Sequence, residues 1–413
     1  MNYLFIHNNY PAQFRSLVEH LAKQPGNQVF FLSEFKRNDV NIPGVQQGIV
    51  PVPDAPGGTR GTDIPLIKTQ RRAESFALAM LELKAKGFYP DIIYYHGGWG
   101  GSLFSGDVFP QARRVNFAEW FFNSHYPYEM NQDDAASQQS ISLLAGGYAT
   151  NHMHLESLAL SDLTITPTEW QKSVQPKVFH NSIKVQHEGV DTDFYIPAQE
   201  KRSLALQELG LKIPVSAQIV TYASRGFEPM RGFPAFMQSL PLLLDAAPEA
   251  HIAIMGDDHV VYDQPRADRR GWLQVLMEQT SLDFSRLHIL PASGLIQYRR
   301  LLQISDLHVY LTRPYVLSWS LLEAMSSGAL VLAANTEPLQ EIAEPGVNMF
   351  TIPANASTLA TPIADPSLLA EQAAALLKQG QATRPVREAA RQTVLDKYSL
   401  KGNLPKLLKL LHG

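Results

Sequence analysis

The sequence predicts an α/β protein made of two doubly wound, Rossmann-like domains. Its 413 residues are more than one ordinary hydrophobic core takes up, and they fit two domains of about 200 residues each. Short runs of β-branched or aromatic residues alternate with longer amphipathic segments from end to end. Strands that are separated by helices favour a parallel sheet. The alternation starts afresh near residue 218, so the chain divides into two halves.

The first half contains five candidate strands. Each is a short apolar run followed by polar or glycine-rich sequence, as expected for strands that are buried on both faces. These runs cover residues 3–7, 28–33, 91–95, 115–118 and 163–166. Helices are predicted over residues 13–23 and 69–87. We therefore expect one parallel sheet with helices packed against it.

The second half repeats this pattern after a polar linker near residues 195–215. Its candidate strands cover residues 218–223, 251–255, 287–290, 307–310 and 330–333. We expect a first domain at residues 1–198 and a second at residues 199–395. Leucines at helical spacing in residues 400–411 predict a last helix. We expect residues 396–413 to cross back to the first domain.

Composition and termini exclude several classes of protein. The net charge of −4 argues against a general nucleic-acid binder. The absence of cysteine excludes disulfides, thiolate metal sites and a cysteine nucleophile. The first residues lack a signal-peptide pattern, and no apolar run is long enough to span a bilayer. We expect a soluble, cytoplasmic protein, for which peripheral contact with the inner face of a membrane stays open.

Motifs for other common cofactors are missing from the sequence. The thirteen histidines are scattered, and none forms a convincing metal-ligand pair with a carboxylate. There is no phosphate-binding loop of the ATPase type, and neither half has a dinucleotide-binding glycine fingerprint after its first strand. We therefore expect no metal and no bound cofactor.

Open parallel sheets bind ligands at the carboxyl ends of their strands, and the second half has two polar motifs there. The stretch from Ser318 begins a helix directly after a loop, so the first backbone amides of that helix suit a phosphate. Glu323 lies within the same helix, where its carboxylate suits two ribose hydroxyls. The plain alternative is an ordinary serine cap and a solvated glutamate.

Two arginines bracket a turn after the first strand of the second half. Arg225 and Arg231 are followed by Gly232 and a helix. Fixed cations stabilise a diphosphate leaving group more in the transition state than in the ground state. Arginine also offers a bidentate fork to phosphate oxygens. The alternative is a pair of solvated arginines near a turn.

The first half has an aromatic and histidine-containing edge. His96 ends an apolar strand, and four glycines around Trp99 predict an open backbone beside a flat aromatic surface. Histidine suits a sugar hydroxyl or proton transfer. Glu119 follows the next strand, and His125 lies in the aromatic stretch after it. These residues are candidates for an acceptor pocket, that is, a pocket for the molecule that would receive a transferred group. The alternative is a capped loop with aromatic side chains in the core.

The stretch from Tyr315 to Gly328 resembles the donor-binding segment of retaining glycosyltransferase family 4, which has the GT-B fold. The family pattern has two glutamates separated by seven residues and a Glu-Ala-Met ending. Glu323 matches the second glutamate, which binds the nucleotide ribose in the family. Tyr315 occupies the place of the first, which contacts the transferred sugar. The departure puts that contact in doubt.

The resemblance implies further residue roles. The amides from Leu317 to Trp319 would hold phosphate and sugar, and His96 would lie near the reacting sugar. Gly256 would let the backbone approach the nucleotide, and Pro291 lies where the family contacts the base. Gln13 stands where many members have a glycine, so its side chain would contact the donor.

The resemblance also implies the activity. We expect two domains that face each other across a cleft and transfer a sugar, with retention, from a nucleotide diphosphate sugar. The acceptor would be a glycan or a lipid-linked hydroxyl in cell-envelope polysaccharide or glycolipid synthesis, and no metal is needed. Two alternatives stay open, namely a GT-B sugar-nucleotide epimerase and a non-catalytic sugar-nucleotide binding protein.

Overall fold

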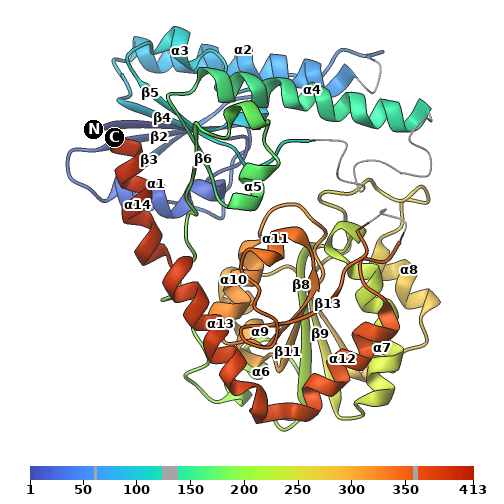
Figure 1. Cartoon of the computed structure of the whole chain (residues 1–413). Coiled ribbons are helices and arrows are strands. Elements are labelled where there is room, and N and C mark those ends of the chain that lie inside the picture. Colours follow the sequence, from blue (N-terminus) through green and yellow to red (C-terminus); the bar gives the residue numbers. More distant parts are fainter. Residues whose placement is uncertain (60–62, 123–137, 357–360) are drawn as a thin grey trace. The chain divides into compact units, whose positions relative to one another are not determined.

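The computed structural model describes residues 1–59, 63–122, 138–356 and 361–413, and these form two compact units (Figure 1). The first unit comprises residues 1–188 together with residues 403–413. The second comprises residues 189–402. The last helix, α14 (Leu400–His412), therefore begins in the second unit and ends in the first.

The first unit contains a seven-stranded parallel sheet in the order β3-β2-β1-β4-β5-β6-β7. The five strands expected in this half are present, and the prediction of a parallel sheet is confirmed. Two edge strands, β3 and β7, escaped prediction because they are short and lack a continuous apolar run. The strands are β1 (Asn2–Ile6), β2 (Gln28–Ser33), β3 (Val45–Ile49), β4 (Ile92–His96), β5 (Arg113–Phe117), β6 (Leu163–Thr166) and β7 (Ile183–Val185).

Helices cover both faces of this sheet (Figure 1). On one face, α1 (Arg15–Ala22) and the end of α14 pack against β1, with Leu407 and Leu411 buried among the aromatic side chains of the sheet. On the other face lie α2 (Ile64–Ala85), α3 (Ser105–Val108) and α4 (Gln138–Leu160). A short helix, α5 (Glu169–Ser173), follows β6.

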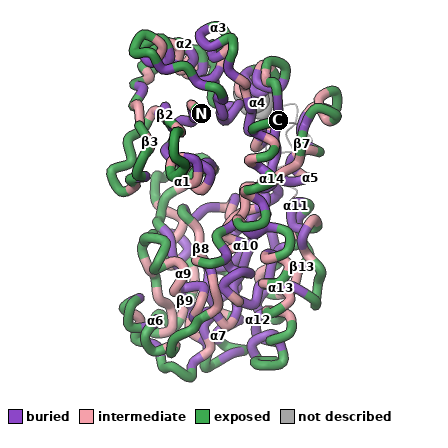
Figure 2. Tube along the Cα trace, turned by 90° about the vertical axis from the view of Figure 1, so that its left-hand side faces the viewer, coloured by how far each residue is buried: buried purple, intermediate pink, exposed green. Residues whose placement is uncertain are grey.

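The second unit contains a six-stranded parallel sheet in the order β10-β9-β8-β11-β12-β13. All five expected strands are present, and β13 is an additional edge strand. The interior of this unit consists of buried segments (Figure 2). The strands are β8 (Gln218–Gly226), β9 (Ala250–Asp257), β10 (Leu287–Leu290), β11 (Leu307–Tyr310), β12 (Val331–Asn335) and β13 (Phe350–Pro353).

Two helical layers enclose the second sheet. One layer is formed by α7 (Phe233–Ala246) and α12 (Pro366–Gln379), which share a large apolar cluster with the strands. The opposite layer comprises α6 (Arg202–Glu208), α9 (Leu295–Ile304), α10 (Trp319–Ser326) and α13 (Arg384–Lys397). The unit also contains α8 (Trp272–Gln279) and α11 (Glu337–Gln340). In the described ranges, no helix is long and apolar enough to cross a membrane.

Candidate active site

Polar side chains follow three adjacent strands of the first unit. His7 comes directly after β1, His96 ends β4, and Glu119 lies two residues beyond β5. These strands are neighbours in the sheet, so their carboxyl ends bring the three side chains together. The imidazole rings of His7 and His96 pack edge to face, with their centroids 5.1 Å apart.

The Glu119 carboxylate is the centre of this group. Gln13 Nε2 donates to Glu119 Oε1 at 2.7 Å, and His96 Nε2 lies 3.2 Å from Glu119 Oε2. Burial opposes ionisation of Glu119, but the hydrogen bonds from His96 and Gln13, together with the electrostatic effect of the two histidines, outweigh it and lower the pKa of the carboxyl. Burial, aided by the nearby His96, lowers the pKa of His7 to about 3, so that ring is neutral at pH 7.

Solvent reaches these residues unequally. The His96 side chain is 4% exposed, and its second nitrogen, Nδ1, is buried without a hydrogen-bond partner among the described residues. The Glu119 side chain is 22% exposed. Trp99 is 37% exposed, and the Arg72 guanidinium lies 5.9 Å from the centre of its ring. At this edge of the sheet, Glu119 and Trp99 are therefore accessible to a ligand, whereas His96 is buried.

The glycine loop after β4 is buried, which contradicts the expectation of an open backbone. A Cβ on Gly97 would lie 2.3 Å from Asn116 Oδ1, and a Cβ on Gly98 would lie 2.3 Å from His154 Nε2. His154 belongs to α4 and is buried. Gly98 is thus required by the close approach of α4, and Gly97 by the close approach of both β5 and α4, where Ser157 Cβ would lie 2.8 Å away.

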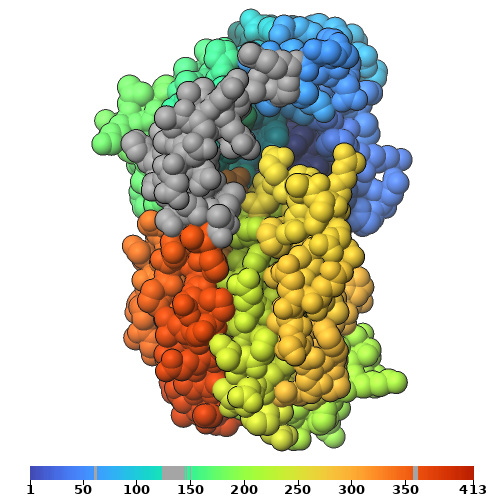
Figure 3. Space-filling model, turned by 90° about the vertical axis from the view of Figure 1, so that its right-hand side faces the viewer, coloured from blue at the N-terminus to red at the C-terminus, as the bar shows by residue number. Residues whose placement is uncertain are grey.

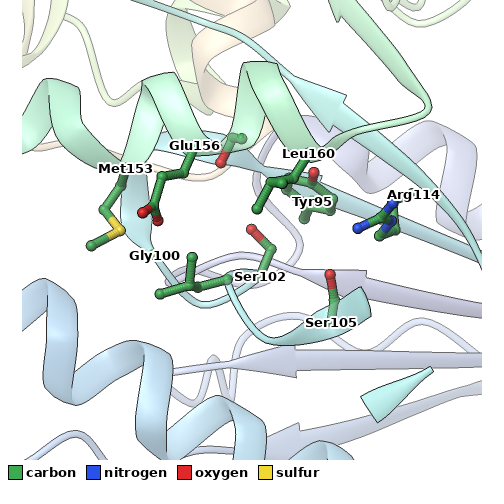
Figure 4. A pocket seen from close by; sticks show the side chains of 10 residues that line it. Tyr95, Gly100, Ser102, Ser105, Arg114, Met153, Glu156 and Leu160 are labelled. Atoms are coloured by element: carbon green, nitrogen blue, oxygen red, sulfur yellow. The ribbon is translucent and has the colours of Figure 1, made fainter. Parts of the chain in front are cut away.

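A small pocket lies behind this loop, between α4 and the residues that follow β4 (Figure 4). Its lining includes Tyr95, Ser102, Arg114 and Glu156, but neither His96 nor Glu119. The pocket is therefore separate from the edge that carries Glu119.

The segment after β7 places a second carboxyl group, that of Glu188, close enough to Glu119 for their charges to interact. Glu188 lines a small pocket with Gln13, Tyr94 and two leucines of α14. Its Oε2 has no hydrogen-bond partner in the described part of the chain and lies 3.8 Å from His187 Nδ1. Burial, with a smaller effect from the charge of Glu119, raises the pKa of Glu188 to about 8. His125, which we predicted for the acceptor pocket, lies outside the described residues.

In the second unit, Arg225 near the end of β8 and Arg231 in the turn after it both lie on one aromatic ring. The guanidinium groups of Arg225 and Arg231 lie 5.7 and 4.8 Å from the centre of the Tyr262 ring. Arg225 Nη2 donates to the Tyr262 hydroxyl at 2.6 Å, and Arg231 Nη1 donates to Thr312 Oγ1 at 3.2 Å. Within the described parts of the chain, neither arginine has a salt bridge to a carboxylate.

The prediction that a helix begins at Ser318 is confirmed. Ser318 is the N-cap of α10, and its hydroxyl oxygen accepts from the Ser320 amide at 3.3 Å. Trp319 begins the helix, and Leu317 before it is buried in the core. The hydroxyl of Tyr310, at the end of β11, interacts with the backbone and side chain of Ser318. The helix start is therefore tied to the end of the neighbouring strand.

Glu323 is held by two tyrosines that the sequence did not indicate. Tyr195 and Tyr298 both hydrogen-bond to its carboxyl group. Burial raises the pKa of Glu323 to about 7, while these two hydrogen bonds act in the opposite direction. Glu323 is thus a positioned acceptor rather than a solvated helix residue.

Gly256 lies near the end of β9, and Pro291 directly follows the neighbouring strand β10. A Cβ on Gly256 would lie 2.1 Å from Ser224 O and 2.7 Å from the Phe227 ring, so the arginine-bearing turn needs this glycine. Pro291 is exposed, and the adjacent Ala292 amide donates to Asp257 Oδ1 at 3.0 Å. Across the described residues, no group of three or more histidine, aspartate or glutamate side chains suits a metal ion.

Two family models match the sequence, one in each half. Residues 25–195 match the glycosyl transferase family 4 group, and residues 217–379 match the glycosyl transferases group 1. No curated protein matches the chain.

Several solved structures share the fold over nearly their whole length. Sucrose-phosphate synthase from Thermosynechococcus elongatus has a TM-score of 0.73 and 16% identity, covering 99% of this chain and 98% of its own. Anabaena HepE in complex with UDP-glucose has a TM-score of 0.70 and 15% identity, with coverage of 100% and 99%. A glycosyltransferase from Rickettsia africae has a TM-score of 0.68 and 16% identity, with coverage of 99% and 97%.

Proposed function

Because the chain belongs to the GT-B glycosyltransferases, with a family 4 first half and a group 1 second half, we propose that it transfers a sugar with retention of configuration. The donor is a nucleotide diphosphate sugar, and the acceptor is a hydroxyl group of a glycan or a lipid-linked saccharide. The observation that carries this proposal is the pair of arginines, Arg225 and Arg231, fixed on one tyrosine without a carboxylate partner among the described residues.

The arginine pair suits the chemistry of the leaving group. When the glycosidic bond breaks, negative charge accumulates on the distal phosphate of the donor. Cations that are already in position stabilise this charge without reorganisation in the transition state. Arg225 donates one side-chain hydrogen bond to Tyr262 and Arg231 donates one to Thr312, so further N–H donors of both remain for phosphate oxygens.

The remaining donor residues are proposed to complete the site. Glu323, oriented by Tyr195 and Tyr298, is the proposed ribose acceptor. The amides near Leu317, Ser318 and Trp319 are proposed to hold phosphate and sugar. Gly256 and Pro291 are proposed to border the nucleotide. The solved complexes of HepE contain UDP-glucose, UDP and glucose, which makes uridine nucleotides the first donors to test.

The first unit is proposed to bind the acceptor. Glu119 is partly exposed and accepts hydrogen bonds, so it suits a sugar hydroxyl. Trp99 offers an aromatic face to the C–H face of a sugar. His96 is proposed to be near the reacting sugar, and it acts through the Glu119 carboxylate that it hydrogen-bonds. With retention, the leaving diphosphate itself accepts the proton of the attacking hydroxyl on the same face.

The test is a donor screen on the whole chain. Thermal stabilisation and slow hydrolysis are measured with UDP-, GDP- and ADP-sugars for the wild type, Arg231→Ala and Glu323→Ala. Arg384→Ala and Glu388→Ala are matched controls, because that exposed pair lies on α13. We expect one donor to stabilise and to be hydrolysed slowly, and both effects to be lost only in the first two variants.

Other outcomes separate the alternatives. Cleavage and inversion of the donor sugar without an acceptor would favour an epimerase. Binding without any turnover, even with acceptor saccharides present, would favour a sugar-nucleotide binding protein. If no sugar nucleotide binds, the donor-site assignment is wrong.

A further inference from the structure

The loop after β9 contributes a tyrosine to the arginine pair that no sequence motif indicates. Tyr262 lies beneath both guanidinium groups, and its hydroxyl accepts from Arg225 Nη2 at 2.6 Å. The residue is 38% exposed, and the segment that carries it, coloured yellow, lies at the surface of the second unit (Figure 3). Tyr262 therefore contacts the cations while more than a third of the residue stays open to solvent.

A buried carboxylate fixes this tyrosine in place. Glu228 is 0% exposed, and its Oε2 accepts from the amides of Val261, Tyr262 and Asp263 at 2.8, 2.9 and 3.0 Å. In the opposite direction, the Met230 amide donates to Asp263 Oδ2 at 2.7 Å. Since Glu228 and Met230 belong to the arginine-bearing turn, hydrogen bonds in both directions join the turn to the loop.

The hydroxyl of Tyr262 has one hydrogen-bonding role left unused. It accepts a hydrogen bond from Arg225, but no acceptor for its own proton is found among the residues that the structure describes. A phenol that accepts a hydrogen bond from a cation becomes a stronger donor, because hydrogen bonds in a chain polarise one another. A phosphate oxygen held by the two arginines would be the natural acceptor for this proton.

We propose that Tyr262 is a third ligand of the donor diphosphate, with its ring positioning Arg225 and Arg231 and its O–H bonded to the distal phosphate. The inference rests on the proposed donor site and adds to it a residue outside the arginine motif. The distal phosphate is the relevant one because it takes up the charge when the sugar leaves.

The test compares nucleoside diphosphates with monophosphates by titration calorimetry at fixed ionic strength. The probes are UDP, GDP and ADP beside UMP, GMP and AMP. Tyr262→Phe keeps the ring and loses the hydroxyl, and Tyr262→Leu loses both. Tyr89→Phe is the control, because Tyr89 is 58% exposed and lies in the first unit.

For the diphosphate that the wild type binds, we expect Tyr262→Phe to weaken binding about tenfold, as for the loss of a hydrogen bond to a charged group. Tyr262→Leu should weaken it further, since the arginines also lose their platform. Both variants should bind the monophosphate as the wild type does, and Tyr89→Phe should bind both ligands unchanged.

The failures are distinguishable. If the wild type binds a diphosphate more tightly than its monophosphate and Tyr262→Phe does so equally, the inference is wrong while the donor site stands. If Tyr262→Phe and Tyr262→Leu weaken both ligands equally, Tyr262 supports the fold only, and the inference is again wrong. If the wild type binds none of the three diphosphates, the proposed function fails together with the inference.

Discussion

Glu188 provides a direct test of the electrostatics in the first unit. Its side chain is 11% exposed, and its Oε2 has no hydrogen-bond partner among the described residues. The neighbouring His187 is buried as well, and burial lowers the pKa of that imidazole to about 4. His187 therefore brings no positive charge to Glu188 at neutral pH. Burial disfavours the charged form of Glu188, and the negative charge of Glu119 adds a smaller effect in the same direction, so the pKa of Glu188 rises to about 8.

The sign of the effect on stability follows from proton binding. The ordinary pKa of a glutamate is 4.5, so between that value and about 8 the folded state binds the proton that the unfolded state has released. Stability therefore falls as the pH rises through this window. A pKa that differs by 1 between the folded and unfolded states corresponds to about 1.4 kcal/mol. Between pH 5 and pH 9 the free energy of unfolding should fall by about 4 kcal/mol from this group alone.

Glu188→Gln removes this titration and keeps the size and shape of the side chain. We expect the free energy of unfolding of the variant, relative to the wild type, to rise by about 4 kcal/mol between pH 5 and pH 9. Urea unfolding followed by tryptophan fluorescence at five pH values measures this difference. Glu82→Gln is the control, because Glu82 is exposed on α2. A difference that stays constant within about 1 kcal/mol across this range would refute the reasoning, since Glu188 would then be ionised in a hydrated pocket.

Two further substitutions test the packing and anchoring described above. Gly98→Ala should destabilise the first unit by about 2 kcal/mol, because its Cβ meets His154, whereas Gly57→Ala, with nothing within 4 Å, should not. Equal urea midpoints for both variants would contradict this. Glu228→Gln should cost about 2 kcal/mol and expose residues 258–271 to limited proteolysis, because three amides lose a charged acceptor. Unchanged cleavage relative to the exposed control Glu371→Gln would show that the loop is held by other contacts.

The central strands could be predicted from the sequence because burial on both faces demands continuous apolar runs. Residues 29–32 (Val-Phe-Phe-Leu) and 92–95 (Ile-Ile-Tyr-Tyr) are such runs, and both lie within strands. The strand β3, with the sequence Val-Gln-Gln-Gly-Ile, lies at the edge of the sheet and is mostly half-buried. An edge strand has one paired side and needs little apolar sequence, so its pattern does not stand out from a loop.

Local signals explain which candidate site residues could be predicted from the sequence. Ser318 is a helix cap, and the arginines flank a turn, so both are readable within a short window. Tyr262 contacts Arg225 although the two residues are 37 positions apart in the sequence. The loop that carries Tyr262 is held by the buried Glu228. No local pattern specifies such a contact. The Gly97–Gly98 pair misled prediction because glycine serves an open loop and a tight packing contact equally well.

The tyrosine at position 315 bears on how the donor would be held. Its ring centroid lies 5.7 Å from that of Tyr262, which in turn lies under Arg231. A carboxylate at position 315, as in the family pattern, would offset part of the arginine charge, whereas a phenol is neutral at pH 7. The exchange therefore leaves more positive potential for the proposed diphosphate ligand and replaces a hydrogen-bonding carboxylate with an aromatic face. On this reasoning the missing glutamate does not indicate an inactive chain. On the proposed function, donor recognition would depend more on the phosphates and less on the hydroxyls of the transferred sugar.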